Sequence, residues 1–280
     1  MTLRVYNTLT GRKERFNPIQ AGVVKMFVCG PTVYDFIHVG HARTYIFYDI
    51  LARYLASQGY NVHFTVNITD LDEKIFEKAR KDSVPYKILA DRYIQEFYRD
   101  ITSLGVDTIT LFAKASNYIQ KAISQVETLL KKGYAYTVDG NTYFDVSRFP
   151  EYGRLSHQSP LDLRLRRINP DPKKHSQTDF LLWTVSQEDE PFWISPMGKG
   201  RPGWHIEDTA ISITVFGPRY DIHGGAIDLI FPHHEAEIAQ AEALTGEKPF
   251  VKYWIHTGIL ECGGRKMSKS LGNCISVRNA

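Results

Sequence analysis

Apolar and polar positions along the chain alternate between the two-residue period of a strand and the longer period of a helix. Short apolar runs and two-residue alternation predict strands over residues 24–29, 61–68, 108–112, 219–223 and 251–258. Spacing typical of an amphipathic helix predicts helices over residues 42–58, 85–104, 118–132, 206–215 and 234–244. Residues 134–146 predict a hairpin, because the Asp139-Gly140 pair favours the primed turns.

This order of elements predicts an α/β fold. Strands and helices alternate on both sides of a differently patterned middle section, which indicates a Rossmann-type doubly wound parallel sheet split by a connective insertion. Residues 149–168 are polar and rich in arginine, so we expect a flexible part of the insertion there. The predicted divisions are the first half of the sheet domain in residues 1–112, the insertion in 113–200, and the second half in 201–280.

Composition narrows the class of protein. The chain has 280 residues and 43% hydrophobic residues, enough for a large core. The 34 Lys and Arg nearly balance the 31 Asp and Glu, so any contact with nucleic acid is local rather than spread over a basic surface. The three cysteines, Cys29, Cys262 and Cys274, form no disulfide framework, which favours a reducing compartment. Without an apolar run long enough for a bilayer, we expect a cytoplasmic protein that does not bind membranes.

A histidine motif follows the first predicted strand. His38-Val39-Gly40-His41 comes after Gly30-Pro31 and precedes a predicted helix. Gly40 allows the backbone to approach a ligand, and the start of a helix presents free N–H groups to phosphate. Taken alone, the motif can also be an incidental match.

A lysine motif, Lys266-Met267-Ser268-Lys269-Ser270, lies near the other end of the sequence. It sits in a glycine-rich loop beside Arg265, and two ammonium groups there suit the charge that develops during phosphoryl or nucleotidyl transfer. The alternative is an ordinary solvated turn. Together and in this order, the two motifs predict a nucleotide-activating site on a parallel sheet.

Several side chains have the chemistry of metal ligands. Cys29 ends the first strand, and His233 and Glu237 are four residues apart, so they share one face of a helix. The alternatives are a buried small hydrophobe for Cys29 and a solvated helical ion pair for His233 and Glu237. Glu207 and Asp208 lie at another predicted helix start, where they can also be capping carboxylates.

In the combination of its motifs, the sequence resembles the cysteinyl-tRNA synthetase family of class I aminoacyl-tRNA synthetases. The matching segments, which span nearly the whole chain, are Phe27 to Asp35 with His38-Val39-Gly40-His41, Asn67 to Lys74, Pro202 to Glu207, Asp221 to Gly225, Phe231 to Glu235, and Lys266 to Ser270.

The resemblance implies ATP-dependent activation of cysteine to cysteinyl-adenylate, with Mg²⁺ accompanying ATP, and transfer of cysteine to tRNA(Cys). It implies that His38 and His41 stabilise the reacting phosphate and that Lys266 and Lys269 neutralise the leaving pyrophosphate. The remaining implied positions are Gly40, Gly225, Asp228 and Lys269 for ATP, and Cys29, Thr32, Thr69 and Trp204 for the amino acid.

The family holds one zinc ion with two cysteines, a histidine and a glutamate, and here Asp208 replaces the second cysteine. Aspartate is a competent zinc ligand with the same charge as a thiolate, so we expect zinc to be held by Cys29, Asp208, His233 and Glu237. Because oxygen is a harder ligand than sulfur, we expect a less selective site and a stronger Lewis acid. The competing hypothesis is loss of the metal or a substrate other than cysteine.

The acceptor of the activated cysteine is a second open question. The family continues beyond the lysine motif into a stem-contact region and an anticodon-binding domain, which the 280 residues do not include. We therefore expect binding of tRNA(Cys) to depend on a C-terminal domain of a complete protein, and we expect a monomer. The alternatives are a ligase that passes cysteine to a small-molecule amine, as in mycothiol-type biosynthesis, and a non-catalytic nucleotide-binding paralogue. The intact histidine and lysine motifs argue against the last alternative.

Overall fold

The computed structural model describes residues 3–158, 171–267 and 272–280, with only the backbone of Lys266. The chain divides into two compact units, each built from three segments. Unit 1 comprises Met1–Arg15, Asn117–Tyr220 and Leu229–Trp254, and unit 2 comprises Phe16–Ser116, Asp221–Asp228 and Ile255–Ala280.

Unit 2 contains β3, β4, β5, nearly all of β11 and the end of β12 from a five-stranded sheet with the order β12-β11-β3-β4-β5. The strands are β3 (Val23–Val28), β4 (Asn61–Ile68), β5 (Leu111–Lys114), β11 (Tyr220–Ala226) and β12 (Val251–Thr257). Strands β11, β3, β4 and β5 pair in parallel, and Met26, Phe64 and Val66 are fully buried. Because β5 and β11 are separated by more than 100 residues of sequence, the predicted parallel α/β sheet interrupted by an insertion is confirmed.

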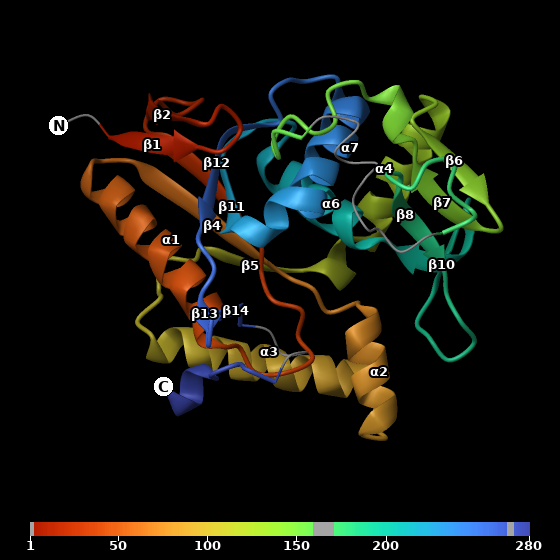
Figure 1. The fold of residues 1–280 in the computed structure, drawn as a ribbon, viewed down its shortest axis with the longest axis horizontal. Helices are drawn as coiled ribbons and strands as arrows, with labels where there is room; N and C mark the ends of the chain where they lie inside the picture. Colours follow the sequence, from red (N-terminus) through yellow and green to blue (C-terminus); the bar gives the residue numbers. More distant parts are fainter. Residues whose placement is uncertain (1–2, 159–170, 268–271) are drawn as a thin grey trace. The chain divides into compact units, whose positions relative to one another are not determined.

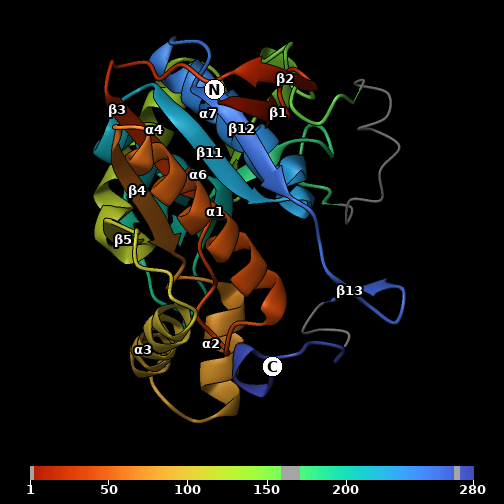
Figure 2. The ribbon, with the colours of Figure 1, turned by 90° about the vertical axis from the view of Figure 1, so that its left-hand side faces the viewer.

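In the described part of unit 2, the α-helices are α1 (Val39–Ser57), α2 (Glu73–Lys81) and α3 (Tyr86–Ser103). Helix α1 runs along one face of the sheet and buries Tyr48 and Leu55 completely (Figure 2). The predicted start of this helix at residue 42 is wrong, since it begins at Val39. The His38 side chain accepts a hydrogen bond from Gly40 N–H as the N-cap, so the histidine motif forms the first turn.

The lysine motif begins in a strand rather than in the predicted loop. Strands β13 (Glu261–Cys262) and β14 (Arg265–Lys266) form an antiparallel pair. Gly263 and Gly264 connect them with φ angles of 61° and 71°, a left-handed conformation that glycine adopts without strain.

Unit 1 contains an antiparallel sheet with the order β6-β7-β8-β10-β9. Its strands are β6 (Ala135–Val138), β7 (Asn141–Phe144), β8 (Phe180–Val185), β9 (Trp193–Ser195) and β10 (Gly198–Pro202). The predicted hairpin is confirmed, because Asp139 and Gly140 connect β6 and β7 with φ angles of 48° and 80°. Half of the segment predicted to be flexible, residues 159–168, lies outside the described residues.

Three helices of unit 1 pack against one another: α4 (Ile119–Lys131), α6 (Trp204–Phe216) and α7 (Glu235–Thr245) (Figure 1). Short helical turns cover Ala115–Tyr118 (η1), Val146–Arg148 (η2), Ile227–Leu229 (η3), Ile230–His234 (η4) and Val277–Asn279 (η6). None of the helices in the described part of the chain combines the length and the apolar composition needed for a membrane crossing.

An N-terminal hairpin of β1 (Arg4–Asn7) and β2 (Arg12–Arg15) completes unit 1. The buried Asn7 side chain joins it to β12, because its Oδ1 accepts a hydrogen bond from Trp254 N–H and its Nδ2 donates to Lys252 O, each at 3.0 Å. The sequence pattern did not predict this hairpin.

Candidate active site

The carboxyl edge of the parallel sheet gathers the predicted residues of unit 2. Cys29 follows β3, Thr69 follows β4, and Gly225 lies near the end of β11. Strands β4 and β11 flank β3 on opposite sides, so the strand order reverses at β3. Open α/β sheets bind their ligands at such a reversal, outside the carboxyl ends of the strands.

The loop after β3 lies directly on the end of β4. The Gly30 N–H donates to Asn67 Oδ1, and a Cβ atom at position 30 would lie 1.5 Å from Asn67 O. Only glycine fits this close approach. The loop continues with a parallel bridge between Thr32 and Thr69, and Val33 N–H donates to Thr69 O at 3.2 Å. The structure therefore brings the two predicted substrate-binding threonines together.

The two imidazoles of the histidine motif lie against each other at the start of α1. His38 Nδ1 accepts from Gly40 N–H at 3.1 Å, and His41 Nδ1 accepts from His38 N–H at 3.3 Å. The ring centroids are 3.9 Å apart. Because each neutral ring accepts at Nδ1, its proton is on Nε2. Two N–H donors at the positive end of a helix are suited to an anionic ligand such as phosphate.

The other predicted nucleotide-binding residues lie in or just after β11 and in the lysine motif. The Gly225 N–H donates to the hydroxyl of the buried Tyr48 at 3.0 Å, and Asp228 is exposed on η3. The Lys266 backbone lies in β14, while Lys269 lies outside the described residues. The roles of both lysines therefore stay predictions.

The sequence analysis missed one neighbour of Cys29, the histidine His223. The Cys29 Sγ lies 3.5 Å from Nε2 of His223, which is fully buried in β11. His223 pairs with Phe27 in the parallel register of β11 and β3, across almost 200 positions of sequence. The spacing of residues along the chain holds no signal of this contact.

A histidine beside Asp228 makes stability depend on pH. Burial lowers the pKa of His256 to about 3, while Asp228 acts in the opposite direction. An unfolded histidine titrates near pH 6.5, so between about pH 6.5 and 3 the unfolded chain binds a proton that the folded chain does not. This contribution to the free energy of unfolding is therefore present above pH 6.5 and is lost as the pH falls, by up to about 1.4 kcal/mol per pH unit.

We expect His256→Gln to flatten the decline in the free energy of unfolding between pH 7 and pH 5, measured by urea denaturation. His63→Gln, at an exposed position on β4, is the matched control and should decline as the wild type does. Identical slopes for wild type and His256→Gln would contradict this prediction.

Unit 1 holds a buried cluster of metal-ligand type, which we call the Asp–His–Glu cluster. Asp208 comes from α6, His233 from η4 and Glu237 from α7. His233 Nε2 lies 3.1 Å from Asp208 Oδ2 and 3.2 Å from Glu237 Oε1, and the three side chains are at most 1% exposed. Two alternatives are therefore wrong: the His233–Glu237 pair is not solvated, and Asp208 does not cap its helix.

The charges in this cluster favour a bound cation. Burial raises the pKa of Glu237 well above its usual range, and the nearby Asp208 carboxylate raises it further. Two buried carboxylates beside one imidazole are costly unless a positive charge balances them. The ligand atoms lie within 4.8 Å of one another, which fits a single metal ion.

Two residues at the start of α6 surround the His233 ring. The Trp204 ring stacks on it with a centroid distance of 4.0 Å and remains 43% exposed. His205 Nδ1 lies 2.8 Å from His233 Nδ1, and burial lowers the pKa of His205 well below its usual range. Gln240 on α7 donates a hydrogen bond to His205 O. Sequence reasoning singled out Trp204 but missed His205, because its contact depends on how α6 meets η4.

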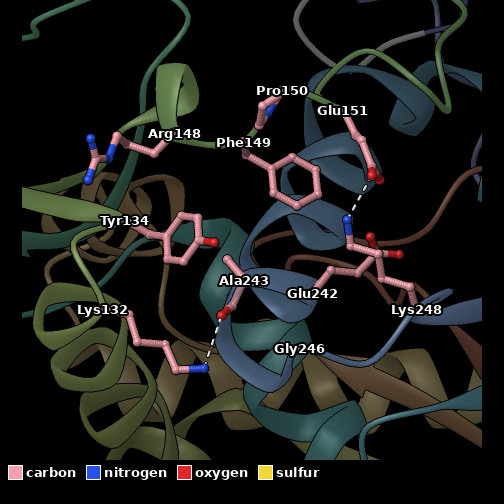
Figure 3. A pocket seen from close by; sticks show the side chains of 10 residues that line it. All are labelled: Lys132, Tyr134, Arg148, Phe149, Pro150, Glu151, Glu242, Ala243, Gly246 and Lys248. Carbon is pink, nitrogen blue, oxygen red and sulfur yellow. Dashed lines mark hydrogen bonds and ion pairs between the residues drawn. The ribbon is translucent and has the colours of Figure 1, made fainter.

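A separate cavity in unit 1, of about 450 Å³, lies beside the end of α7 (Figure 3). Its polar groups bond mostly with each other: Lys248 Nζ pairs with Glu151 at 2.8 Å, and Lys132 Nζ donates to Ala243 O at 3.3 Å. Glu242 is already bonded to Arg154 at 2.8 Å. The cavity contains no residue that the sequence analysis predicted for the site.

Comparison with known proteins gives consistent results. The family model described as "tRNA synthetases class I (C) catalytic domain" matches residues 15–280. The cysteine–tRNA ligase of Thermoplasma acidophilum is 51% identical over 278 residues, covering 99% of this chain and 61% of that protein. The cysteine–tRNA ligase of Persephonella marina is 49% identical over 279 residues, covering 99% of this chain and 57% of that protein. The chain thus spans about three-fifths of the length of the curated relatives it matches.

Solved structures share the fold at low sequence identity. The methionyl-tRNA synthetase of Mycobacterium tuberculosis in complex with methionyl-adenylate matches with a TM-score of 0.69 and 18% identity, covering 91% of this chain and 61% of that one. A putative arginyl-tRNA synthetase from Campylobacter jejuni matches with a TM-score of 0.59 and 15% identity, covering 91% of this chain and 59% of that one.

Proposed function

Because the chain belongs to the class I (C) tRNA synthetase catalytic-domain family, we propose that it activates cysteine with ATP and serves the transfer of cysteine to tRNA(Cys). In the activation step a carboxylate oxygen of cysteine attacks the α-phosphorus of ATP. The bond from that phosphorus to the bridging oxygen of the β-phosphate breaks, and cysteinyl-adenylate and pyrophosphate form. The observation that carries this proposal is the close His38 and His41 pair at the start of α1, on the carboxyl side of the parallel sheet.

The residues of unit 2 stabilise the charge that builds up in this step. We assign His38 and His41 to the α-phosphate, because N–H donors fixed in advance stabilise a developing anion without reorganising. Gly40 lets the phosphate approach the first turn of α1. Gly225 and Asp228 are assigned to adenosine, with the Asp228 carboxylate accepting from a ribose hydroxyl. Lys266 and Lys269 are assigned to the departing pyrophosphate, and Mg²⁺ accompanies ATP.

We further propose that the Asp–His–Glu cluster binds zinc. Asp208, His233 and Glu237 supply oxygen and nitrogen ligands, and Cys29 is assigned as the thiolate ligand from its place in the resemblance. When bound, the ion supplies a direct bond to the substrate sulfur, and such a bond separates cysteine from serine better than the small size difference between them. Trp204, Thr32 and Thr69 are assigned to the rest of the amino acid. The stacked Trp204 ring restricts the His233 imidazole to one orientation.

The acceptor, location and organisation of the whole protein are part of the proposal. Relatives about 50% identical that are named as cysteine–tRNA ligases favour tRNA(Cys) over a small-molecule amine as the acceptor. We propose residues 1–112 and 201–280 as the two halves of the catalytic domain, with 113–200 as the insertion. A cytoplasmic location and a monomeric state stay predictions.

ATP–pyrophosphate exchange tests the proposed activation step. With labelled pyrophosphate we expect exchange that depends on cysteine and is at least about 100-fold slower with serine, because a hydroxyl is a poor ligand for zinc compared with a thiolate. Alanine and methionine are further controls. Exchange with another amino acid would show that aspartate at position 208 changes the amino acid that is activated. No exchange with any amino acid would refute the proposed function.

A further inference from the structure

The chain segment that carries the lysine motif begins against helix α1. The Arg43 guanidinium, on α1, donates hydrogen bonds to the carbonyl oxygens of Gly258 and Ile259, the latter at 3.2 Å. Just before this point, the hydroxyls of Thr44 and Thr257 are buried and bonded at 3.0 Å. The end of β12 is therefore fixed to the second turn of the helix that the histidine motif begins.

The same segment returns to the histidine motif at its other end. Val39 N–H donates to Ile275 O at 3.0 Å, and Val277 N–H donates to Ile37 O at 3.2 Å. Between these bonds Ser276 forms an antiparallel bridge with His38, the N-cap of α1. The backbone after the lysine motif thus lies against the residues that position the first imidazole.

Arg278 fastens this returning end to helix α3. Its Nε donates to Asp100 Oδ1 at 2.8 Å, and its Nη2 pairs with Glu96. The guanidinium also lies 4.3 Å from the centre of the Phe36 ring, two residues before His38. Asp100 is only 5% exposed, and the bond from Arg278 lowers the pKa of Glu96. The Arg278 side chain thereby joins the returning segment both to α3 and to Phe36, just before the histidine motif.

We propose that Arg43 and Arg278 are positioning residues for the activation of ATP. They fix the two ends of the segment between residues 259 and 275 to the turn that carries His38 and His41. The described residues on either side of the lysine motif thereby hold the first turn of α1, so that the two imidazoles keep their place against the triphosphate. Neither arginine has to touch ATP for this role, which rests on the function proposed above.

The test uses Arg278→Ala in the whole chain. We expect kcat/KM for ATP in cysteine-dependent pyrophosphate exchange to fall about 10- to 100-fold, since small displacements of catalytic groups have effects of this size. The KM for cysteine should not change. In the same variant the amide hydrogens of Val39 and Val277 should exchange faster with solvent, while those of β3 and β4 keep their protection.

Two further variants separate positioning from general stability. Arg99→Ala is the matched control, because Arg99 pairs with the same Glu96 at 3.1 Å but from within α3, and it should leave both measurements unchanged. Arg278→Lys keeps a charge for one carboxylate but loses the planar fork, so we expect partial recovery of kcat/KM for ATP. Arg43→Ala should also lower kcat/KM for ATP, because it removes the hydrogen bonds to Gly258 O and Ile259 O at the first end of the segment.

Each outcome decides the proposal. Faster amide exchange with an unchanged kcat/KM for ATP would overturn the positioning role. An amide exchange rate and a kcat/KM for ATP that both stay unchanged would also overturn it. A KM for cysteine that rises together with the loss of kcat/KM for ATP would indicate general destabilisation and would also overturn it. If the wild-type chain exchanges with no amino acid, the proposed function fails and the positioning role fails with it, whereas the amide measurement still decides whether Arg278 anchors the segment.

Discussion

Purified Asp208→Ala protein is expected to contain less than about a tenth of the zinc of the wild type, which should hold about one ion per chain. Cysteine-dependent pyrophosphate exchange should fall at least about 100-fold, since even the outer partners of metal ligands contribute 10- to 100-fold. The reason is structural: without Asp208, Glu237 is the one carboxylate of the cluster that remains to balance a divalent cation. Metal analysis of dialysed protein gives the first number, and exchange kinetics give the second.

Two variants sharpen this test. Asp208→Cys restores a sulfur ligand with the same charge, so we expect it to keep zinc and to bind it more selectively over magnesium and manganese. Glu235→Gln is the matched control, because Glu235 is a buried carboxylate on the same helix as Glu237 but accepts hydrogen bonds from Leu155 and Ser156 N–H. It should keep its zinc. Wild-type protein that is purified without zinc and gains none on addition would refute the metal site.

The second large effect is expected at the histidine motif. His41→Ala should lower kcat of cysteine-dependent exchange about 100- to 1000-fold, the usual result of removing one donor to a developing anion. Its KM for cysteine should stay near the wild-type value, because His41 is assigned to the phosphate and not to the amino acid. Steady-state exchange kinetics at varied ATP and cysteine separate the two parameters.

His38 needs a different design, because its side chain also caps helix α1. His38→Ala removes both the imidazole and the cap, so it should lower activity and cost about 1 kcal/mol of stability. His38→Asn keeps a good N-cap residue and removes only the imidazole. We expect equal losses of activity in both variants but a lower melting temperature only in His38→Ala. Wild-type activity in His38→Asn would show that His38 is structural.

Local patterns predicted the elements that carry the candidate site. The spacing of His233 and Glu237 placed both on one helical face, and the structure joins them at 3.2 Å. The start of α1 was predicted three residues late, because capping by an imidazole is not a usual start signal. Turn chemistry was reliable at Asp139-Gly140, where both residues have positive φ angles.

What the sequence missed depends on contacts between distant segments. His223 reaches Cys29 through the register of two parallel strands, and His205 reaches His233 across two helical segments. Helix α2 was not predicted, although Asp72 caps it by accepting from Lys74 N–H. The charged strand β2 (Arg12–Arg15) shows no apolar alternation and pairs with β1. Propensity within a short window carries little information about such elements.

The division of each unit into three segments has a consequence for folding during synthesis. The hairpin β1–β2 is made long before β12, yet its Asn7 bonds with Trp254, 247 residues later. Unit 2 likewise requires β11 and the end of β12, on the far side of the insertion. Neither unit can therefore complete its core on the ribosome until most of the chain has been translated, and long-range closure of this kind slows folding. The nascent N-terminal half exposes unpaired strand edges during that delay, so we expect it to need chaperones more than the finished protein does.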